Sequence, residues 1–577
     1  MKMSWYKYIK PYLGFFILGP LCMIVEVIGE VVMPKLLATV INNANAGTLT
    51  NGLSIGIMFA MIGMAVFMMV GGVGGAYFGA KASVNFAADL REDCYRKIQG
   101  YSFANIDKFS TGSLVTRLTN DITQVQNLVN MMLRMMFRAP GMMIAALIMA
   151  IKIQPRLSLV FAVAIPVMLL VIGLIIVKGF PRFGIMQEKV DGLNSTVQES
   201  VTNVRVVKSF VREDREIDKF HTANGNLKAA GISAMKVVIF MQPVMTLFMQ
   251  GAIIAVILIG GPIVARGDMA VGDLSAFLTY VTQILSSLLM VTFMLMISSR
   301  ALASAKRIRE VIEEKIDLDD GNASHKERRV TAGSVSFRDV TFRYYKNSED
   351  AVLDHINLEI PGGATVGIIG STGCGKTTLV SMIPRLYDCD EGEILVDGVN
   401  VKDYSIYNLR EGVGMVLQKN TLFSGSVAEN LRWGDENASD EEMIRMSDYA
   451  QADKFVSAWK EGYETEIEHG GSNVSGGQKQ RLCIARALLK KPKILILDDS
   501  TSAVDTATEL QIRKAFREQI PDATKIIIAQ RITSVMEADE IVVMDDGRIT
   551  GVGTHEELLK SNEEYREIYE SQMGKEA

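Results

Sequence analysis

A glycine-rich segment at residues 370–378 follows an apolar stretch, 364–369, and precedes the apolar residues LVSMI. A strand, a glycine-rich loop and a helix in this order form a phosphate-binding loop, in which backbone N–H groups and the helix N-terminus surround the phosphates. We expect Lys376 to reach the β- and γ-phosphates of ATP and the Thr377 hydroxyl to coordinate Mg²⁺. The segment consists of Gly370, Ser371, Thr372, Gly373, Cys374, Gly375, Lys376, Thr377 and Thr378.

Two later segments supply groups that such a site needs. The apolar run 494–497 ends at Asp498, and a carboxylate in this place is expected to hold Mg²⁺, directly or through water. Before it, the segment 474–478 (VSGGQ) places a hydroxyl beside two glycines, which can present donors to a γ-phosphate. The residues of this segment expected to contact nucleotide are Ser475, Gly476, Gly477 and Gln478.

The elements around these residues divide the chain into two halves. The chain has 577 residues, 49% of them hydrophobic, and this length exceeds that of one ordinary domain. Up to about Arg307 long apolar runs carry few charges, whereas the remainder alternates short apolar strands with charged helices. We expect an all-α transmembrane domain of six helices at 1–307, a linker at 308–330 and a C-terminal α/β P-loop NTPase domain at 331–577.

Six apolar runs in the first half are long enough to cross the hydrocarbon core of a bilayer, near 13–40, 53–79, 131–151, 157–177, 237–264 and 274–298. Long basic segments of helical pattern follow the second and fourth runs, whereas the opposite loops carry only Lys152, Arg156 and Arg266. The positive-inside rule then places both termini and the long segments in the cytoplasm. Within them, 105–121 and 203–213 are either coupling elements that contact the soluble domain or plain solvated helix surface.

Several residues of the membrane half have two interpretations. Glu26 and Glu30 share a helix face, and carboxylates at membrane depth indicate a substrate or cation role, or the lining of an aqueous cavity. Gly71, Gly75 and Gly79 have the spacing that lets helices pack closely. Two methionine clusters fit a deformable apolar pocket or ordinary packing: Met131, Met132, Met135 and Met136, and Met290, Met294 and Met296.

The composition argues against several classes of protein. The net charge is −5 and the soluble half has no basic footprint, so nucleic acid is not an expected partner. The 5 cysteines lack ligand spacing, which indicates neither a zinc site nor a disulfide framework and fits a reducing compartment. The basic N-terminus resembles a signal peptide, but Glu26 and Glu30 interrupt the apolar run and no cleavage pattern follows.

Together, these motifs resemble a half-transporter of the ATP-binding-cassette superfamily, in the bacterial multidrug-exporter group, over nearly the whole chain. The resemblance implies that Tyr344 stacks on adenine and that Gln418 is the glutamine that responds to Mg²⁺ and to coupling. It makes VSGGQ the signature motif, with Val474 in place of the usual leucine, and 502–505 the D-loop, which ends at Asp505.

Two residues depart from the pattern of that family. Where the family has a glutamate that polarises the attacking water, this chain has Asp499, and Gln530 replaces the switch histidine. Aspartate is one methylene shorter, and a misplacement of about 1 Å can slow catalysis on the order of 10²-fold. Glutamine exchanges hydrogen bonds but cannot take a proton as imidazole does. We therefore expect slow hydrolysis on this phosphate loop.

The resemblance also implies a dimer in which each ATP lies between one phosphate loop and the signature motif of the other chain. An impaired base and switch beside an intact signature is similar to the degenerate-site subunit of heterodimeric exporters. We therefore expect a second, non-identical half-transporter as partner, with hydrolysis mainly at the partner's site. Neutral drift in an active homodimer, and an ATP-gated channel or regulatory subunit, stay open as alternatives.

The expected function is ATP-driven export of hydrophobic or amphipathic, multidrug-type compounds across the bacterial cytoplasmic membrane by alternating access. The membrane-first order of the two domains is associated in this family with export rather than import. The expected ligands are ATP, Mg²⁺ and a small hydrophobic substrate, and the expected surroundings are the lipid bilayer. The sequence does not choose among drugs, lipids, peptides and siderophores as substrates.

Overall fold

The computed structural model describes residues 3–321, 323–345, 350–500 and 504–574. They form two compact units. The membrane unit contains the residues up to Ile98 and Gly112–Glu313, and the nucleotide unit contains Gln99–Thr111 and the residues from Glu314 onward. A short segment from the first half of the chain, Gln99–Thr111, therefore belongs to the nucleotide unit.

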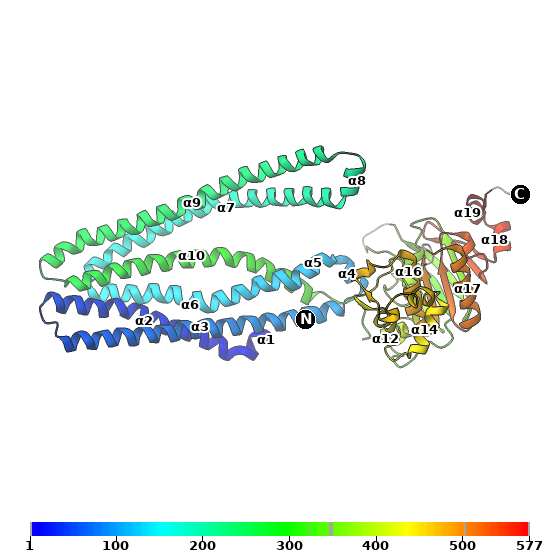
Figure 1. Ribbon diagram of the computed structural model, residues 1–577, viewed down its shortest axis with the longest axis horizontal. Coiled ribbons are helices and arrows are strands. Elements are labelled where there is room, and N and C mark those ends of the chain that lie inside the picture. Colours follow the sequence, from blue (N-terminus) through cyan, green and yellow to red (C-terminus); the bar gives the residue numbers. More distant parts are fainter. Residues whose placement is uncertain (1–2, 322, 346–349, 501–503, 575–577) are drawn as a thin grey trace. The chain divides into compact units, whose positions relative to one another are not determined.

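The described membrane unit is built from helices, and 6 candidate spans are long and apolar enough to cross a membrane. This confirms the predicted six-helix, all-α class. In Figure 1 the short α8 joins α7 to α9, which run back along each other. The helices are α1 (Tyr6–Ile9), η1 (Lys10–Tyr12), α2 (Leu13–Asn45), α3 (Asn51–Gln99), α5 (Thr111–Thr116), η2 (Arg117–Asp121), α6 (Ile122–Ile153), α7 (Pro155–Thr202), α8 (Val204–Ser209), α9 (Glu213–Ala265) and α10 (Val271–Glu313).

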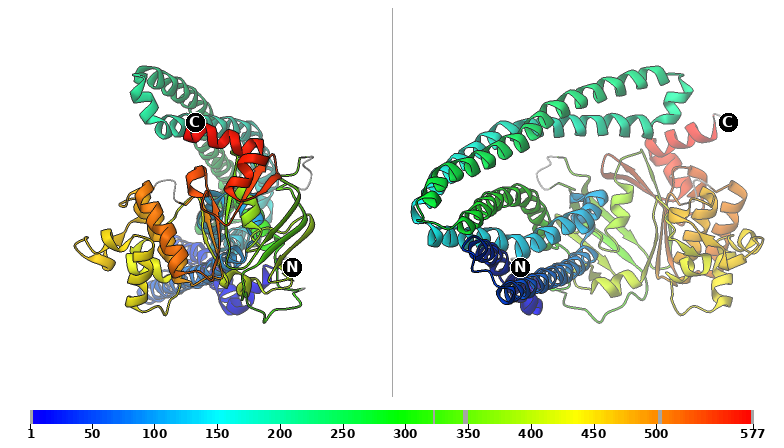
Figure 2. Two further views of the ribbon diagram at one scale, coloured as in Figure 1. Left: turned by 90° about the vertical axis from the view of Figure 1, so that its right-hand side faces the viewer. Right: turned by 60° about the vertical axis from the view of Figure 1, so that its left-hand side comes forward.

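The longest helices extend well beyond the thickness of a membrane. The helix α3 has 49 residues and α9 has 53. At about 1.5 Å per residue, such helices are roughly 70–80 Å long, whereas the hydrocarbon core is about 30 Å thick. In both figures the α8 end of the α7–α9 pair projects away from α6 and α10, which lie side by side (Figures 1 and 2). The long extensions predicted from the sequence are therefore helical.

Large apolar side chains hold the membrane unit together. Phe277 and Tyr280 of α10 are fully buried, and the ring of Phe161 stacks on that of Phe277 with centroids 5.6 Å apart. The Tyr280 hydroxyl donates a 2.8 Å hydrogen bond to the carbonyl oxygen of Val31. Since Val31 lies on α2, this bond connects α10 to a helix that is distant in the sequence.

Two glycines of α3 allow a close approach to α2. A Cβ atom at Gly71 would lie 2.9 Å from the Cys22 carbonyl oxygen and 2.9 Å from the Glu26 nitrogen, both of which are backbone atoms. A Cβ atom at Gly75 would lie 2.1 Å from the Met23 methyl carbon. A larger residue at Gly71 would push the helices apart, whereas at Gly75 the flexible Met23 side chain would have to move. Both contacts agree with the predicted packing role of these glycines.

The helix α10 continues to Glu313, into the segment 308–330 that we expected to be a linker. Ile308 and Val311 are each only 1% exposed. Ile308 packs with Leu90 and Ile122 in one apolar cluster. Burial of these side chains stabilises the additional turns of α10. The charged residues around them lower the mean hydropathy of this segment, so the sequence did not reveal the continuation of the helix.

The nucleotide unit is built on a sheet of 6 strands in the order β12-β11-β3-β10-β9-β6. All neighbouring pairs are parallel except β11 with β12. A second sheet has the antiparallel order β2-β1-β4-β5, and β7 pairs with β8. The strands are β1 (Val335–Phe342), β2 (Leu353–Ile360), β3 (Thr365–Gly370), β4 (Glu391–Val396), β5 (Val399–Asn400), β6 (Val413–Val416), β7 (Gly425–Ser426), β8 (Glu466–Ile467), β9 (Ile494–Asp498), β10 (Thr524–Ile528), β11 (Glu540–Asp545) and β12 (Arg548–Gly553).

The parallel strands bring their carboxyl ends to one edge of the sheet. The strand β10 lies between β3 and β9, so residues that follow these three strands come together in space. This edge is where open α/β sheets bind ligands. The predicted α/β NTPase fold is confirmed, and its helices are α4 (Phe103–Lys108), α11 (Lys376–Ser381), α12 (Ile406–Glu411), α13 (Val427–Arg432), α14 (Asp440–Tyr449), α15 (Asp453–Val456), η3 (Gly462–Glu464), η4 (His469–Gly471), α16 (Gly476–Leu489), α17 (Thr506–Gln519), η5 (Ile532–Ser534), α18 (His555–Ser561) and α19 (Glu563–Met573).

Candidate nucleotide-binding site

The phosphate loop joins β3 to α11 and depends on two glycines for its conformation. Gly375, the N-cap of α11, has a φ of 97°, a backbone conformation that glycine adopts without strain. At Gly370, a Cβ atom would lie 2.0 Å from the Met544 carbonyl oxygen. The Lys376 ammonium donates hydrogen bonds to the carbonyl oxygens of Gly370 (2.8 Å) and Ser371 (2.7 Å). Its charge is therefore held against the loop, where it can pair with phosphate oxygens.

The remaining loop residues separate into an exposed and a buried set. Ser371, Thr372 and Gly373 are exposed, and the Ser371 hydroxyl donates a 2.9 Å hydrogen bond to Asp545. Cys374 and Thr378 are buried beneath the loop. The exposed residues can therefore face a ligand, whereas the buried ones support the backbone.

The residues predicted to hold Mg²⁺ meet beside the loop. The Thr377 hydroxyl donates a 3.0 Å hydrogen bond to one carboxylate oxygen of Asp498, which is only 2% exposed. The other carboxylate oxygen is buried and has no partner among the described residues. Burial raises the pKa of Asp498, and the neighbouring Asp499 charge raises it further. An orphaned carboxylate oxygen beside a hydroxyl fits a hard cation that prefers oxygen ligands, so these residues fit Mg²⁺.

The two residues that depart from the family pattern are bonded to each other. The Gln530 amide donates a 2.8 Å hydrogen bond to the Asp499 carboxylate, and Gln418 bonds the same carboxylate. Asp499 has a φ of 47°, which residues other than glycine rarely adopt. Burial raises the pKa of Asp499, whereas the two glutamines and Lys376 lower it. The predicted base, switch and coupling residues therefore form one cluster at the end of β9.

Tyr344, expected to stack on adenine, lies beside the phosphate loop. Its hydroxyl oxygen is 2.9 Å from that of Thr378. The residue is 45% exposed, which leaves ring surface for a base. Its ring contacts Phe342 and Tyr387 edge to face, with centroids 5.0 and 5.3 Å apart. The stacking on adenine stays a prediction, and the ring already lies within an aromatic cluster.

The signature segment forms the start of a helix rather than part of the phosphate loop. The Ser475 hydroxyl accepts a hydrogen bond from the Gln478 backbone, and the Gln478 side chain accepts one from the Ser475 backbone, so the two residues form a capping box on α16. Ser475 and Gly476 are exposed and Gly477 is half-buried. In the described part of the nucleotide unit, no hydrogen bond connects 475–478 to 370–378.

The D-loop is described only at its end. Asp505 caps α17 by accepting a 3.0 Å hydrogen bond from the Thr508 backbone. Ser502 and Ala503 of the predicted D-loop lie outside the described residues. Its contact with a second chain stays a prediction.

Sequence reasoning missed two further groups. The carboxylates of Glu26 and Glu30 both pair with Arg138, at 3.4 and 2.6 Å. In the sequence, the signal for this pairing was a basic residue inside the apolar run 131–151.

The second group is in the nucleotide unit, where Tyr387 contacts Tyr344 and also bonds Asp107 of α4. No sequence pattern distinguishes this tyrosine from others in loops, because its role depends on a helix about 280 residues away.

Family models match both units of the chain. The model described as "ABC transporter transmembrane region" matches residues 16–288, and that described as "ABC transporter" matches residues 353–502. The chain belongs to the ABC transporter family. Its nucleotide unit is thus an ABC ATPase domain that is coupled to transport, and ATP binding is a property of that domain.

Relatives of this ABC transporter align over almost its full length. An uncharacterized ABC transporter ATP-binding protein YfiB of Bacillus subtilis is 37% identical over 99% of this chain and 98% of its own length. A second Bacillus subtilis relative, YfiC, is 30% identical over 99% of this chain and 94% of its own length. A protein named fatty acid ABC transporter ATP-binding/permease protein, of Mycobacterium bovis, is 34% identical over 82% of this chain and 74% of its own length.

A solved structure has the same fold as this ABC transporter. The structure of a bacterial Atm1-family ABC exporter with ATP bound superimposes with a TM-score of 0.79, and 99% of each chain is covered. The sequences are 24% identical, so this likeness concerns the fold. It agrees with the fused order of an N-terminal six-helix membrane domain and a C-terminal ATPase domain.

Proposed function

We propose that this ABC transporter exports hydrophobic or amphipathic compounds as one of two non-identical half-transporters, and that its own phosphate loop holds ATP but hydrolyses it slowly. The observation that carries the proposal is the 2.8 Å hydrogen bond from Gln530 to Asp499. The two residues that would polarise water and sense the γ-phosphate satisfy each other. Asp499 is one methylene shorter than the usual glutamate, and Gln530 lacks the proton-accepting nitrogen of the usual histidine.

Contacts at the phosphate loop support the binding of ATP, whereas those at Asp499 support slow hydrolysis. Lys376 is held against the loop, and Thr377 and Asp498 are positioned to hold Mg²⁺. When bound, Mg²⁺ supplies positive charge that neutralises the phosphate oxygens. Asp499 is held by two amides, so it is restrained from reaching an attacking water. This arrangement favours retention of ATP over turnover.

The signature segment supports a role at the site of a second chain. Ser475 and Gly476 are exposed at the N-terminus of α16, a helix of 14 residues, where N–H groups favour a phosphate. Within this chain the segment has no hydrogen bond to the phosphate loop among the described residues. We propose that it completes the competent site of a partner half-transporter, which would perform most of the hydrolysis.

The substrate class and the membrane follow from the same proposal. The candidate spans place the chain in a membrane, and the basic bias of the long segments supports a cytoplasmic location for the nucleotide unit. The relative named for fatty acids supports substrates with an acyl chain. Export then requires that closure of the ATPase domains turns the membrane cavity outward in a bacterial cytoplasmic membrane.

The test is the ATPase activity of the full-length chain, purified and reconstituted alone. We expect it to bind ATP with high occupancy but to hydrolyse it far below the usual enzymatic rate of about 10 s⁻¹. Lys376→Ala is the control that removes ATP binding. A turnover of the isolated chain near the usual rate would overturn the proposal.

A second measurement uses the chain assembled with its partner half-transporter. Ser475→Ala in this chain should lower hydrolysis by the complex strongly, since it alters the partner's site. Asp499→Asn should lower it only weakly, because it alters a site that already turns over slowly. Equal losses in the two variants would contradict a heterodimer with unequal sites.

A further inference from the structure

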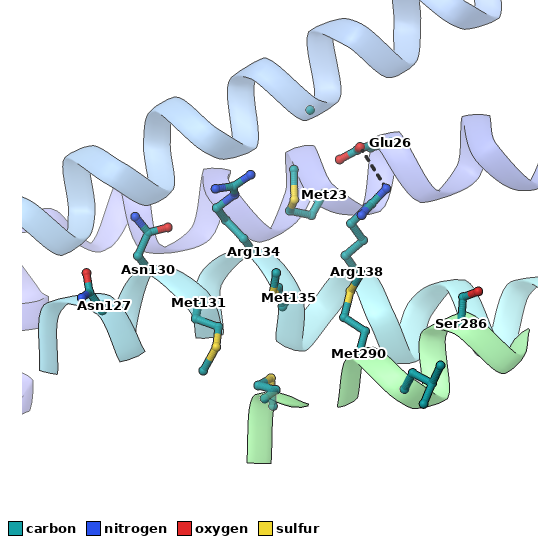
Figure 3. A pocket seen from close by; sticks show the side chains of 13 residues that line it. Met23, Glu26, Asn127, Asn130, Met131, Arg134, Met135, Arg138, Ser286 and Met290 are labelled. Atoms are coloured by element: carbon teal, nitrogen blue, oxygen red, sulfur yellow. Dashed lines mark ion pairs between the residues drawn. The ribbon is translucent and has the colours of Figure 1, made fainter. Parts of the chain in front are cut away.

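A cavity of about 870 Å³ lies among α2, α3, α6 and α10 of the membrane unit. This volume is within the range of pockets that hold small ligands. Its lining combines charged groups with thioether side chains (Figure 3). Met296 of the predicted methionine cluster lies outside the residues whose side chains are described, whereas Met290 and Met294 line the cavity.

One arginine of the cavity is already neutralised. The Arg138 guanidinium pairs with Glu30 at 2.6 Å and with Glu26 at 3.4 Å. Its side chain is 31% exposed and those of the glutamates are 22% and 19% exposed, so the three groups are partly shielded from water. The cluster contains both membrane carboxylates, and with a single guanidinium it carries one more formal negative charge than positive. A cationic ligand would have to displace Arg138 in order to reach them.

A second arginine of the cavity has no such partner. Arg134 lies one helical turn before Arg138 on α6, and it forms no ion pair or hydrogen bond with any described residue. The first part of its side chain packs on α3, where a Cβ atom at Gly79 would lie 3.3 Å from the Arg134 Cγ. In Figure 3 the guanidinium groups of both arginines point toward α2. The charge of Arg134 is thus presented to the cavity without a direct partner among the described residues.

The position of Arg134 along α6 corresponds to one face of a bilayer. Arg134 precedes Ile153, the last residue of α6, by 19 positions. At about 1.5 Å per residue this separation is roughly 28 Å, close to the thickness of the hydrocarbon core of about 30 Å. With the end of α6 at one face of a bilayer, Arg134 would lie near the other face, at the depth of the head of an amphipathic molecule whose chain is in the core.

The surroundings of Arg134 divide into a polar and an apolar part. Asn127 and Asn130 line the cavity from the preceding turns of α6, on the side of Arg134 away from the core. On the other side, Met135 of α6 and Met290 of α10 supply unbranched thioether chains that adapt to flexible ligands. Figure 3 shows Met131 directed away from the arginine heads. A ligand with a small polar head and an apolar chain fits both parts at once.

We propose that this cavity binds an anionic amphipathic molecule, with its charged head on the Arg134 guanidinium and its hydrocarbon chain among the methionines. The inference rests on the proposed export of amphipathic compounds and names the charge of their head group. A carboxylate and a phosphate monoester share the chemistry that a planar guanidinium recognises with two parallel hydrogen bonds. The Arg138 cluster forms the wall of the cavity behind this head.

The test is photo-crosslinking of the full-length chain in nanodiscs of zwitterionic lipid. The probe is a fatty acid that carries a diazirine on its chain, and the labelled residues are located by mass spectrometry. Four competitors with the same twelve-carbon chain are compared: dodecanoate, dodecyl phosphate, dodecanol and dodecyltrimethylammonium. Dodecanoate against dodecyl phosphate distinguishes a carboxylate from a phosphate head.

The two anionic competitors should displace the probe from the cavity at roughly tenfold lower concentration than dodecanol or dodecyltrimethylammonium, as expected for one charge-assisted interaction at a partly exposed site. Arg134→Gln should abolish this preference, and Arg134→Lys should retain only part of it, because lysine keeps the charge but cannot form two parallel hydrogen bonds. Lys152→Gln is the matched control, because it removes one positive charge from an exposed position of the same helix outside the cavity. ATP binding by each variant verifies that it is folded.

Other outcomes would overturn the inference. Equal competition by all four compounds would show that the cavity does not distinguish the charge of the head group. The cavity would still bind amphipathic molecules, as the proposed function requires. Stronger competition by dodecyltrimethylammonium would assign recognition to the glutamates instead. A preference for anions that survives Arg134→Gln would place the recognition elsewhere. Absence of cavity labelling by the probe would contradict both this inference and the proposed amphipathic substrate.

Discussion

The Tyr387 hydroxyl donates a 2.7 Å hydrogen bond to the Asp107 carboxylate, although the two residues are 280 positions apart in the sequence. Asp107 lies on α4, the short helix from the first half of the chain that belongs to the nucleotide unit. The ring of Phe103, also on α4, contacts that of Tyr387 with centroids 6.1 Å apart. Since Tyr387 also contacts Tyr344, one tyrosine joins α4 to the ring expected to stack on adenine.

The hydrogen bond to Asp107 should be measurable as local protection of α4. Burial raises the pKa of Tyr387, so the hydroxyl stays a donor throughout the working range of pH. Tyr387→Phe removes a donor to a charged acceptor, which contributes on the order of 1.5–3 kcal/mol. We expect faster hydrogen exchange of the α4 amides, measured by mass spectrometry on the full chain. Tyr407→Phe, at a tyrosine that is 71% exposed, is the control, and equal exchange in the two variants would contradict the link.

Restoring the usual pair of residues should raise hydrolysis on this phosphate loop. In Asp499→Glu combined with Gln530→His, the carboxylate gains one methylene and the switch gains a nitrogen that accepts a proton. We expect ATP turnover of the isolated chain to rise on the order of 10²-fold, the cost of a misplacement of about 1 Å. Turnover is measured by phosphate release, with ATP affinity as the control. An unchanged rate would show that another part of the site limits hydrolysis.

The effect of Mg²⁺ on ATP affinity should weaken in acid sooner than for an ordinary carboxylate. The pKa of Asp498 is raised from the usual 3.8 by burial and by the charge of Asp499. Because the protonated form cannot hold a cation, lowering the pH toward this raised pKa reduces the contribution of Mg²⁺. In the nucleotide-free chain the sign is opposite: the folded state binds a proton more tightly than the unfolded state, so this group favours folding as the pH falls.

The measurement is ATP affinity of the full chain with Mg²⁺ and with a chelator, over a series of pH values. The gap between the two affinities should begin to narrow above pH 3.8, where a carboxylate of usual pKa is still ionised. Asp498→Asn should show a small gap at every pH. A gap in the native chain that stays constant down to that pH would refute the assignment of Asp498.

A methyl group at Gly71 should destabilise the packing of α2 on α3. The added Cβ would lie 2.9 Å from two backbone atoms of α2, which cannot move aside as a side chain can. Overpacking of this kind costs about 1–3 kcal/mol. Gly71→Ala should therefore lower the thermal stability of the detergent-solubilised chain. The control is Gly63→Ala in the same helix, where nothing lies within 4 Å of the new methyl group, and we expect stability there to be kept or raised. The prediction fails if the two variants unfold at the same temperature.

Much of the fold could be predicted because it depends on local patterns. Apolar runs of the length of a bilayer predict the six spans, and alternating short strands and helices predict the α/β unit. The end of α10 was harder, since its last turns carry charges and are stabilised by the burial of Ile308 and Val311. Helix α4 was assigned to the nucleotide unit only by its contacts, because its sequence is equally compatible with a solvated surface.

The sequence by itself predicts a phosphate-binding loop at 370–378, because such a loop is formed by consecutive residues whose backbone conformation their own types dictate. It also showed that Asp499 and Gln530 differ from the usual pair. Only the tertiary structure decided that these two side chains bond each other, that Arg138 pairs with both Glu26 and Glu30, and that Arg134 faces a cavity. Each of these depends on which helices and strands lie side by side, and packing between distant segments leaves no periodic pattern along the chain.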